Sequence, residues 1–201
     1  MTTDPTLLRR TLRARRAELD PATLRAHGRA ASALVRRSGW YRKAHRIALY
    51  LPVGGELDLH DLIESGWSDR KQLYLPVLAP FGANRLWFAP YTPDTRLAPN
   101  RFGILEPDVH PKAWHHPRQL DLVLTPLVGF DLAGRRLGMG GGYYDRSFAF
   151  RRGASRGHPR LLGAAHSVQQ VEALAPQPWD VPLDGVVTEF AFHIFPHRNR
   201  P

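Results

Sequence analysis

Apolar and polar positions along the chain follow a helical period in some segments and a strand period in others. Residues 6–19 bring leucines to one face and arginines to another, which predicts an amphipathic helix. A second helix is predicted over residues 21–37, because Asp20 can cap it and the proline that follows suits its first position. Residues 58–65 return to helical spacing, and Gly66 is expected to end that helix.

Short apolar runs between these segments predict the strands of a sheet. The run at 122–128 is the most apolar, so we expect it near the centre of the sheet. A helix is expected after Gly142, and a short one from Ser167 through Leu174, whereas residues 92–119 are expected to be irregular. The other predicted strands are 46–52, 72–77, 86–91, 161–165 and 185–189.

Strands that alternate with helices favour an α/β fold, a three-layer αβα domain with a mostly parallel sheet. The chain has 201 residues, which suits one domain, and its ordered core is expected over about residues 6–195. No linker that would divide the chain is visible in its sequence.

Composition narrows the classes of partner. The chain has 28 Lys+Arg against 18 Asp+Glu, a net charge of +10, which favours an anionic partner. Nucleic acid, an acidic membrane face or a small phosphate- or carboxylate-bearing molecule would each fit. The sequence has no cysteine, which excludes disulfides, thiolate catalysis and cysteine zinc sites. The polar start of the chain and the lack of a long apolar run predict a cytoplasmic protein.

A glycine-rich segment from Arg136 to Asp145 follows the most apolar predicted strand. Four glycines within residues 138–142 allow tight turns, and successive N–H groups could bind the oxyanions of a phosphate. Arg136 adds a cation, and the carboxylate of Asp145 would suit Mg²⁺. The segment matches neither the Walker A pattern nor a complete Rossmann fingerprint. The alternative is a tight strand-to-helix turn that binds no ligand.

Several segments together resemble the 5-formyltetrahydrofolate cyclo-ligase family. The glycine-rich string continues to Arg146 and follows Thr-Pro-Leu-Val-Gly-Phe-Asp at 125–131. The resemblance covers residues 6–190, most of the chain. Other matching segments, in chain order, are Gly55–Asp58, Tyr74–Val77, Phe102–Pro107, Trp179–Asp184 and Val187–Glu189.

The resemblance implies a fold like that of the ribose-phosphate isomerase and CoA-transferase group. It also implies Mg-ATP-dependent conversion of 5-formyltetrahydrofolate to 5,10-methenyltetrahydrofolate, with release of ADP and phosphate. In that reaction the formyl oxygen attacks the γ-phosphate, and N10 then displaces phosphate from the imidate phosphate. Phosphoryl transfer needs mainly positioning and charge neutralisation, which the glycine-rich segment could supply.

The resemblance also assigns roles to residues. Catalytic roles are expected for Arg136, Tyr143 and Asp145, and metal binding for Asp145 with Asp180 as a second ligand. Pro5 stands where the family usually has a lysine, four residues before Arg9. The expected ATP contacts are Arg9, Arg136, Leu137, Gly138, Met139, Gly140, Gly141, Gly142, Tyr143 and Tyr144. The expected folate contacts are Leu51, Glu56, Phe102, Met139 and Tyr143.

Simpler interpretations of these residues stay open. Glu56 could be a carboxylate at a helix N-terminus, and Asp180 could initiate a turn. Phe102 could be a core residue, and the arginines of residues 6–19 could form a solvated helix face. The ten histidines show no zinc-like spacing, so no metal role is assigned to them.

Two other functions compete with the ligase. The net charge, with aromatic residues among the arginines of 36–46, would suit a nucleic-acid-associated protein. A sugar-phosphate isomerase or CoA-transferase-like enzyme would share the fold without using ATP. The partners expected for the ligase are the two small-molecule substrates, with neither nucleic acid nor membrane, and the protein is expected to be a monomer or weak dimer.

Overall fold

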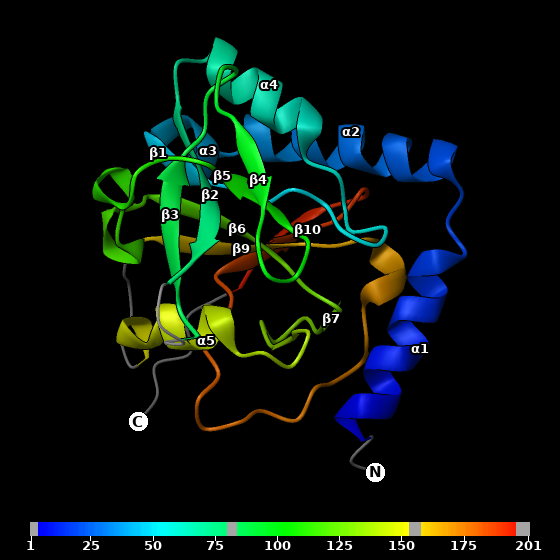
Figure 1. Cartoon of the computed structure of the whole chain (residues 1–201). Coiled ribbons are helices and arrows are strands. Elements are labelled where there is room, and N and C mark those ends of the chain that lie inside the picture. Colours follow the sequence, from blue (N-terminus) through cyan, green and yellow to red (C-terminus); the bar gives the residue numbers. More distant parts are fainter. Residues whose placement is uncertain (1–3, 80–83, 153–157, 196–201) are drawn as a thin grey trace.

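A seven-stranded sheet in the order β11-β10-β9-β6-β1-β2-β3 forms the centre of the molecule (Figure 1). The computed structural model describes residues 4–79, 84–152 and 158–195. The five inner strands are parallel, and antiparallel strands β3 and β11 lie at the two edges. The strands are β1 Arg46–Ala48, β2 Gln72–Leu78, β3 Leu86–Pro90, β6 Leu122–Pro126, β9 Arg160–Ala164, β10 Gly185–Val187 and β11 Phe192–Ile194. The expected α/β fold is confirmed, with the 122–128 run at the centre of the sheet.

Five α-helices are described, and the longest begins where its cap predicts. The Asp20 carboxylate accepts hydrogen bonds from the N–H groups of Ala22 (2.8 Å) and Thr23 (3.0 Å) at the start of α2. The α-helices are α1 Pro5–Ala17, α2 Pro21–Arg37, α3 Gly39–Lys43, α4 His60–Ser68 and α5 Tyr143–Ser147. Single 3-10 turns are η1 Pro111–Ala113, η2 Pro117–Gln119, η3 Ala149–Arg151 and η4 Ser167–Gln169.

Alternate residues of each inner strand face opposite sides of the sheet and build two apolar cores. Ile47 and Leu49 belong to the core on the α2–α3–α4 side, whereas Ala48 and Val123 belong to the other core. In Figure 1, α2, α3 and α4 lie on one side of the sheet and α5 lies on the other. The core on the second side includes Phe130 and the α5–η3 segment with Phe148 and Phe150, so the outer layers are unequal in helix content.

Three local expectations are wrong. Gly66 lies inside α4, where a Cβ would come within 2.9 Å of Leu73 Cδ2, so it permits close packing of helix on strand. Residues 92–119 contain the hairpin of β4 (Leu97–Pro99) and β5 (Leu105–Pro107). The helix expected through Leu174 is only the η4 turn, because the backbone then pairs with Phe130.

Candidate active site

The glycine loop, residues 138–142, lies between β8 (Arg136–Leu137) and α5, and β8 pairs with β7 (Gly129–Phe130) just beyond the end of β6. Gly140 and Gly142 have φ angles of 98° and 62°, a conformation that residues with a Cβ rarely adopt. The expected helix after Gly142 is confirmed, but α5 has only 5 residues. The loop therefore stands at the carboxyl end of a central parallel strand, where α/β proteins bind ligands.

The carbonyl groups of this loop are bound by arginines, whereas its N–H groups are left available. Arg9 Nε donates to the carbonyl oxygen of Gly138 at 2.8 Å, and the Arg146 guanidinium donates to that of Gly141. Within residues 4–79, 84–152 and 158–195, the N–H groups of 138–142 have no hydrogen-bond acceptor. Such a run of free backbone donors is what an oxyanion requires.

The two expected metal ligands lie near each other, and Arg136 contacts one of them. Arg136 Nη2 is 2.5 Å from Asp145 Oδ1, and the Arg136 side chain is only 7% exposed. The Val181 N–H also donates to Asp145 Oδ1, at 3.0 Å. Burial raises the pKa of Asp180, and the neighbouring Asp145 charge raises this pKa further. Asp180 also accepts from the Gln177 N–H at 2.9 Å, and its own N–H donates to the Gln177 carbonyl, so Asp180 ends a turn that begins at Gln177 and does not initiate one.

The two tyrosines that follow the loop point into different surroundings. The hydroxyl of Tyr143 accepts from Arg101 Nη2 at 3.0 Å, and its ring meets that of Phe102 edge-on, with centroids 6.3 Å apart. Phe102 is 57% exposed, so its interpretation as a core residue is wrong. Tyr144 instead packs inward, with its ring stacked on Phe148. Both tyrosines are partly buried against the same core, and Tyr143 is the one whose ring meets the exposed Phe102.

Glu56 lies in the loop between β1 and α4, four residues before that helix begins, so it is not a helix N-terminal carboxylate. Its Oε2 accepts from the Val53 N–H at 3.1 Å, and burial raises its pKa. Burial raises the pKa of Tyr144, and the charge of Glu56 raises it further. The Glu56 loop therefore lies near the segment that follows the glycines. Leu51 is half-buried on the adjoining core.

The arginines of α1 face these loops. The sequence predicted such a role for Arg9 but not for Arg13 or Arg16. Arg13 Nη2 lies 3.0 Å from the sulfur of Met139, a residue that is 60% exposed. Arg16 is buried against Gly54 and Gly55, and burial lowers its pKa while the Glu56 charge opposes that shift. The interpretation as a solvated face is therefore wrong for Arg16. Its position two helical turns after Arg9, on the same face of α1, was the available signal.

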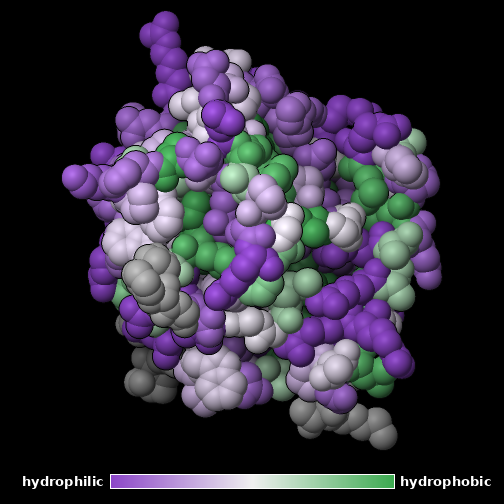
Figure 2. Space-filling model, in the orientation of Figure 1, coloured by the Kyte–Doolittle hydropathy of each residue, from purple (hydrophilic) through white to green (hydrophobic). Residues whose placement is uncertain are grey.

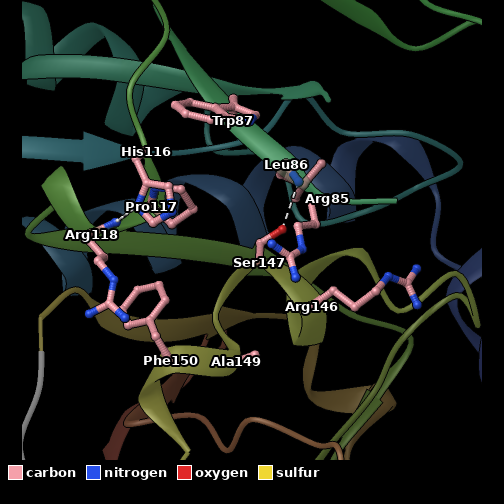
Figure 3. A pocket seen from close by; sticks show the side chains of 10 residues that line it. All are labelled: Arg85, Leu86, Trp87, His116, Pro117, Arg118, Arg146, Ser147, Ala149 and Phe150. Atoms are coloured by element: carbon pink, nitrogen blue, oxygen red, sulfur yellow. Dashed lines mark hydrogen bonds between the residues drawn. The ribbon is translucent and has the colours of Figure 1, made fainter. Parts of the chain in front are cut away.

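A separate pocket of about 290 Å³ lies between β3 and the α5–η3 segment (Figure 3). It is lined by three arginines, Arg85, Arg118 and Arg146, and Arg118 stacks over the Phe150 ring at 4.1 Å. None of the expected ATP or folate contacts lines it. The face of the molecule shown in Figure 2 is largely hydrophilic, with apolar residues in smaller groups. Among the described helices, none combines the length and hydropathy needed to span a bilayer.

The fold and these groups define an α/β protein with a candidate anion-binding loop beside two carboxylates. The 5-formyltetrahydrofolate cyclo-ligase family matches residues 2–189, and the chain belongs to this family. A 5-formyltetrahydrofolate cyclo-ligase of Escherichia coli K12 is 40% identical over 177 residues, 88% of this chain and 96% of its own length. One of Haemophilus influenzae is 45% identical over 142 residues, 71% of this chain and 74% of its own.

The structure agrees with this assignment. The solved 5,10-methenyltetrahydrofolate synthetase of Aquifex aeolicus aligns with a TM-score of 0.80 and 30% identity, covering 98% of this chain and 94% of that one. A synthetase of the same name from Mycoplasma pneumoniae aligns with a TM-score of 0.71 and 25% identity, over 93% and 99% of the two chains. The family resemblance of the motifs is therefore confirmed.

Proposed function

We propose that this chain converts 5-formyltetrahydrofolate to 5,10-methenyltetrahydrofolate with consumption of ATP and release of ADP and phosphate. Membership of the family supports the reaction. The observation that carries the site assignment is the run of acceptor-free N–H groups over residues 138–142 in the described structure, next to the Arg136 guanidinium. These donors would hold the triphosphate, with Arg9 and residues 136–144 as the ATP contacts.

The chemistry proceeds in two substitutions. The formyl oxygen attacks the γ-phosphate and ADP leaves. The formyl oxygen, a poor leaving group by itself, can then depart as phosphate, which is a good one. N10 then attacks the activated carbon, the ring closes and phosphate departs. Backbone amides and Arg136 would stabilise the charge that develops on the transferred phosphoryl group, and Tyr143 would border the reacting groups.

Two carboxylates would hold Mg²⁺ beside the triphosphate. Among the described residues, Asp145 uses only Oδ1 and Asp180 only Oδ2 as hydrogen-bond acceptors, so each keeps one oxygen for a hard cation. Bound Mg²⁺ would neutralise phosphate charge. Arg136, which already contacts Asp145, would keep that carboxylate oriented.

The folate would lie between the Glu56 loop and the accessible aromatic residues. Glu56 would accept hydrogen bonds from the amino-pyrimidine edge of the pterin, and Leu51 would line the same pocket. Tyr143 and Phe102 offer ring faces, and the exposed Met139 adds an adaptable apolar contact. We place this activity in the cytoplasm, with a monomeric or weakly dimeric enzyme.

One mixing experiment tests the reaction. The purified chain, 5-formyltetrahydrofolate and Mg-ATP should together give the near-ultraviolet absorbance of the methenyl product, with ADP formed in equal amount. Omission of ATP or of the folate should abolish both signals. A folded preparation that releases ADP without the folate, or gives no absorbance rise, would contradict the proposal. Salt-sensitive binding of mixed DNA or RNA in place of turnover would favour the nucleic-acid alternative.

A further inference from the structure

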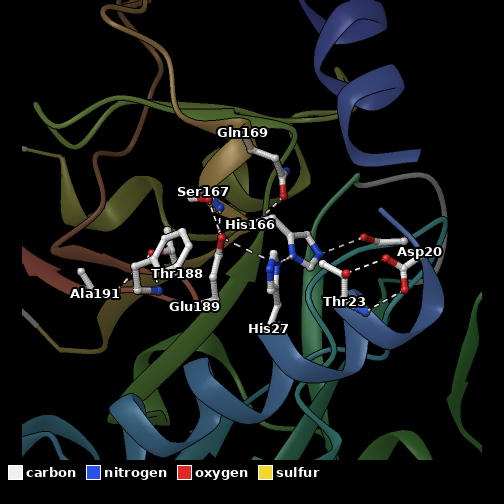
Figure 4. Close-up of polar contacts among 11 residues, drawn as sticks. Asp20, Thr23, His27, His166, Ser167, Gln169, Thr188, Glu189 and Ala191 are labelled. Atoms are coloured by element: carbon white, nitrogen blue, oxygen red, sulfur yellow. Dashed lines mark hydrogen bonds and ion pairs between the residues drawn. The ribbon is translucent and has the colours of Figure 1, made fainter. Parts of the chain in front are cut away.

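Two histidines and a glutamate from three separate segments meet in the protein interior (Figure 4). His27 projects from α2, His166 follows β9, and Glu189 follows β10. Their potential ligand atoms all lie within 4.8 Å of one another. His27 Nδ1 is 2.9 Å from His166 Nδ1 and 3.6 Å from Glu189 Oε1.

Neighbouring groups orient the two innermost side chains of this cluster. His166 Nε2 is 3.2 Å from the Gly55 carbonyl oxygen, which can only accept, so Nε2 carries the proton and Nδ1 presents a lone pair. Both oxygens of Glu189 are held by Ser167, Oε2 by its N–H at 3.0 Å and Oε1 by its hydroxyl. Outer hydrogen bonds of this kind are typical of ligands in metal sites.

Burial shields the cluster from solvent. The His166 side chain is fully buried, and the side chains of His27 and Glu189 are 17% and 3% exposed. Arg16 lies near His166, and its positive charge is opposed by the nearby Glu56 carboxylate.

We propose that His27, His166 and Glu189 bind a divalent transition-metal ion of the Zn²⁺ class, at a site separate from the Mg²⁺ carboxylates. Two imidazole nitrogens and one carboxylate oxygen suit Zn²⁺ or Co²⁺ and not Mg²⁺, which prefers oxygen ligands and retains its waters. Metal–nitrogen bonds of about 2.0–2.1 Å at tetrahedral angles would require the two Nδ1 atoms to move apart to roughly 3.3 Å. Water would take the fourth position.

Binding requires a change of proton at His27. In the ion-free cluster one proton lies between the two Nδ1 atoms. The ion takes the place of that proton, which leaves Nδ1 of His27 while Nε2 of His27 takes up a proton, so both Nδ1 lone pairs face the ion. Without metal, the same three residues form a hydrogen-bonded histidine pair beside a carboxylate. The two states are thus distinguishable by experiment.

The site would fasten the loop that carries Glu56. His166 contacts the Gly55 carbonyl, and Gly55 immediately precedes Glu56. An ion at His166 would therefore restrict the Glu56 carboxylate and lower the KM for the folate. This consequence rests on the proposed function, whereas binding of the ion does not.

Untagged full-length protein treated with chelator and titrated with Co²⁺ tests the site directly. One equivalent should bind with visible absorption bands of low-symmetry nitrogen–oxygen coordination, and Zn²⁺ should displace it while excess Mg²⁺ should not. Loss of outer hydrogen-bond partners alone weakens metal sites by about 10–100-fold, so His27→Ala should weaken Co²⁺ binding by about 100-fold or more.

Three matched variants make the result decisive. His60→Ala removes an exposed helical histidine and should leave Co²⁺ affinity unchanged. Asp145→Asn should also leave it unchanged, because it alters only the proposed Mg²⁺ site. His166→Gln keeps an amide donor for the Gly55 carbonyl and should abolish the bands. The proposal is overturned if the wild-type chain binds no Co²⁺ or Zn²⁺, or if His27→Ala binds them as the wild type does. Either result is independent of turnover.

Discussion

Arg136 and Asp145 are bound to each other, with Nη2 and Oδ1 2.5 Å apart, although one is the expected phosphate ligand and the other the expected metal ligand. Arg136 also donates to the Val181 carbonyl, and the Val181 N–H donates to Asp145. The cation and the carboxylate are therefore held by the same short segment that carries Asp180. A guanidinium has five donor hydrogens, so Arg136 can keep Asp145 in place while it contacts a phosphate.

Asp145→Asn should lower kcat by about 100-fold or more, because it removes one charge from the site that would hold Mg²⁺. The amide oxygen can still accept from the Val181 N–H, but Arg136 loses its counter-charge, so the chain should still fold while its melting temperature falls. Turnover measured against Mg²⁺ concentration, with a melting curve, checks both expectations. Asp94→Asn, at an exposed carboxylate, is the matched control. Full activity of the Asp145 variant would rule out the metal assignment.

Arg9→Ala should raise the KM for ATP by about tenfold with a smaller change in kcat, since a hydrogen bond from a charged group contributes about 1.5–3 kcal/mol. Arg9 anchors the carbonyl of Gly138, and its loss would loosen the loop as well as remove a cation. Arg10→Ala removes the adjacent exposed arginine and should leave the KM unchanged. Equal effects of the two variants would mean that only the general positive charge of α1 matters.

Glu56 should make folate binding dependent on pH. Burial raises its pKa, so on acidification it takes up a proton at a higher pH than an exposed glutamate does. A protonated carboxyl group accepts fewer hydrogen bonds, and the KM for the folate should rise as the pH falls through this pKa. Glu56→Gln should have a high KM at every pH. The proposed role is wrong if wild type and variant follow the same pH profile.

Asp184→Asn should lower the free energy of unfolding by about 3 kcal/mol, because it leaves a buried guanidinium without its counter-charge. Arg151 donates to both carboxylate oxygens of Asp184, at 2.6 and 2.9 Å, and the Leu161 N–H is a further donor. Urea unfolding measures the change, and Asp94→Asn should stay within about 0.5 kcal/mol of wild type. A loss of turnover without a loss of stability would instead place Asp184 in the site.

The sequence predicts those features that depend on neighbouring residues. Asp20 followed by proline fixes the start of α2, and the glycine spacing identifies the loop and its turns. The resemblance then adds Glu56 and Arg9, which lie in separate segments. The hairpin within residues 92–119 is harder to predict, because β4 and β5 are only three residues each and contain proline.

Contacts between distant segments could not be predicted from spacing. His27 and His166 are 139 residues apart, so no local pattern indicates that their rings meet. Arg16 looks like any arginine on an amphipathic helix, and its burial depends on how α1 docks against Gly54 and Gly55. Tyr143 and Tyr144 are adjacent and both pack against the same core, yet the Tyr143 hydroxyl meets Arg101 and the Tyr144 ring stacks on Phe148. Tertiary packing decides each of these.

Helix α1 touches both halves of the proposed site, with Arg9 at the glycine loop and Arg16 at the loop before Glu56. Ligands that bind only when the helix is docked stabilise docking by an amount that grows with the logarithm of ligand concentration above Kd. Binding of nucleotide and binding of folate would then both favour the docked position of α1. Each ligand would raise the affinity for the other without any direct contact between them. The rate of amide hydrogen exchange along α1 would report how stably the helix is docked.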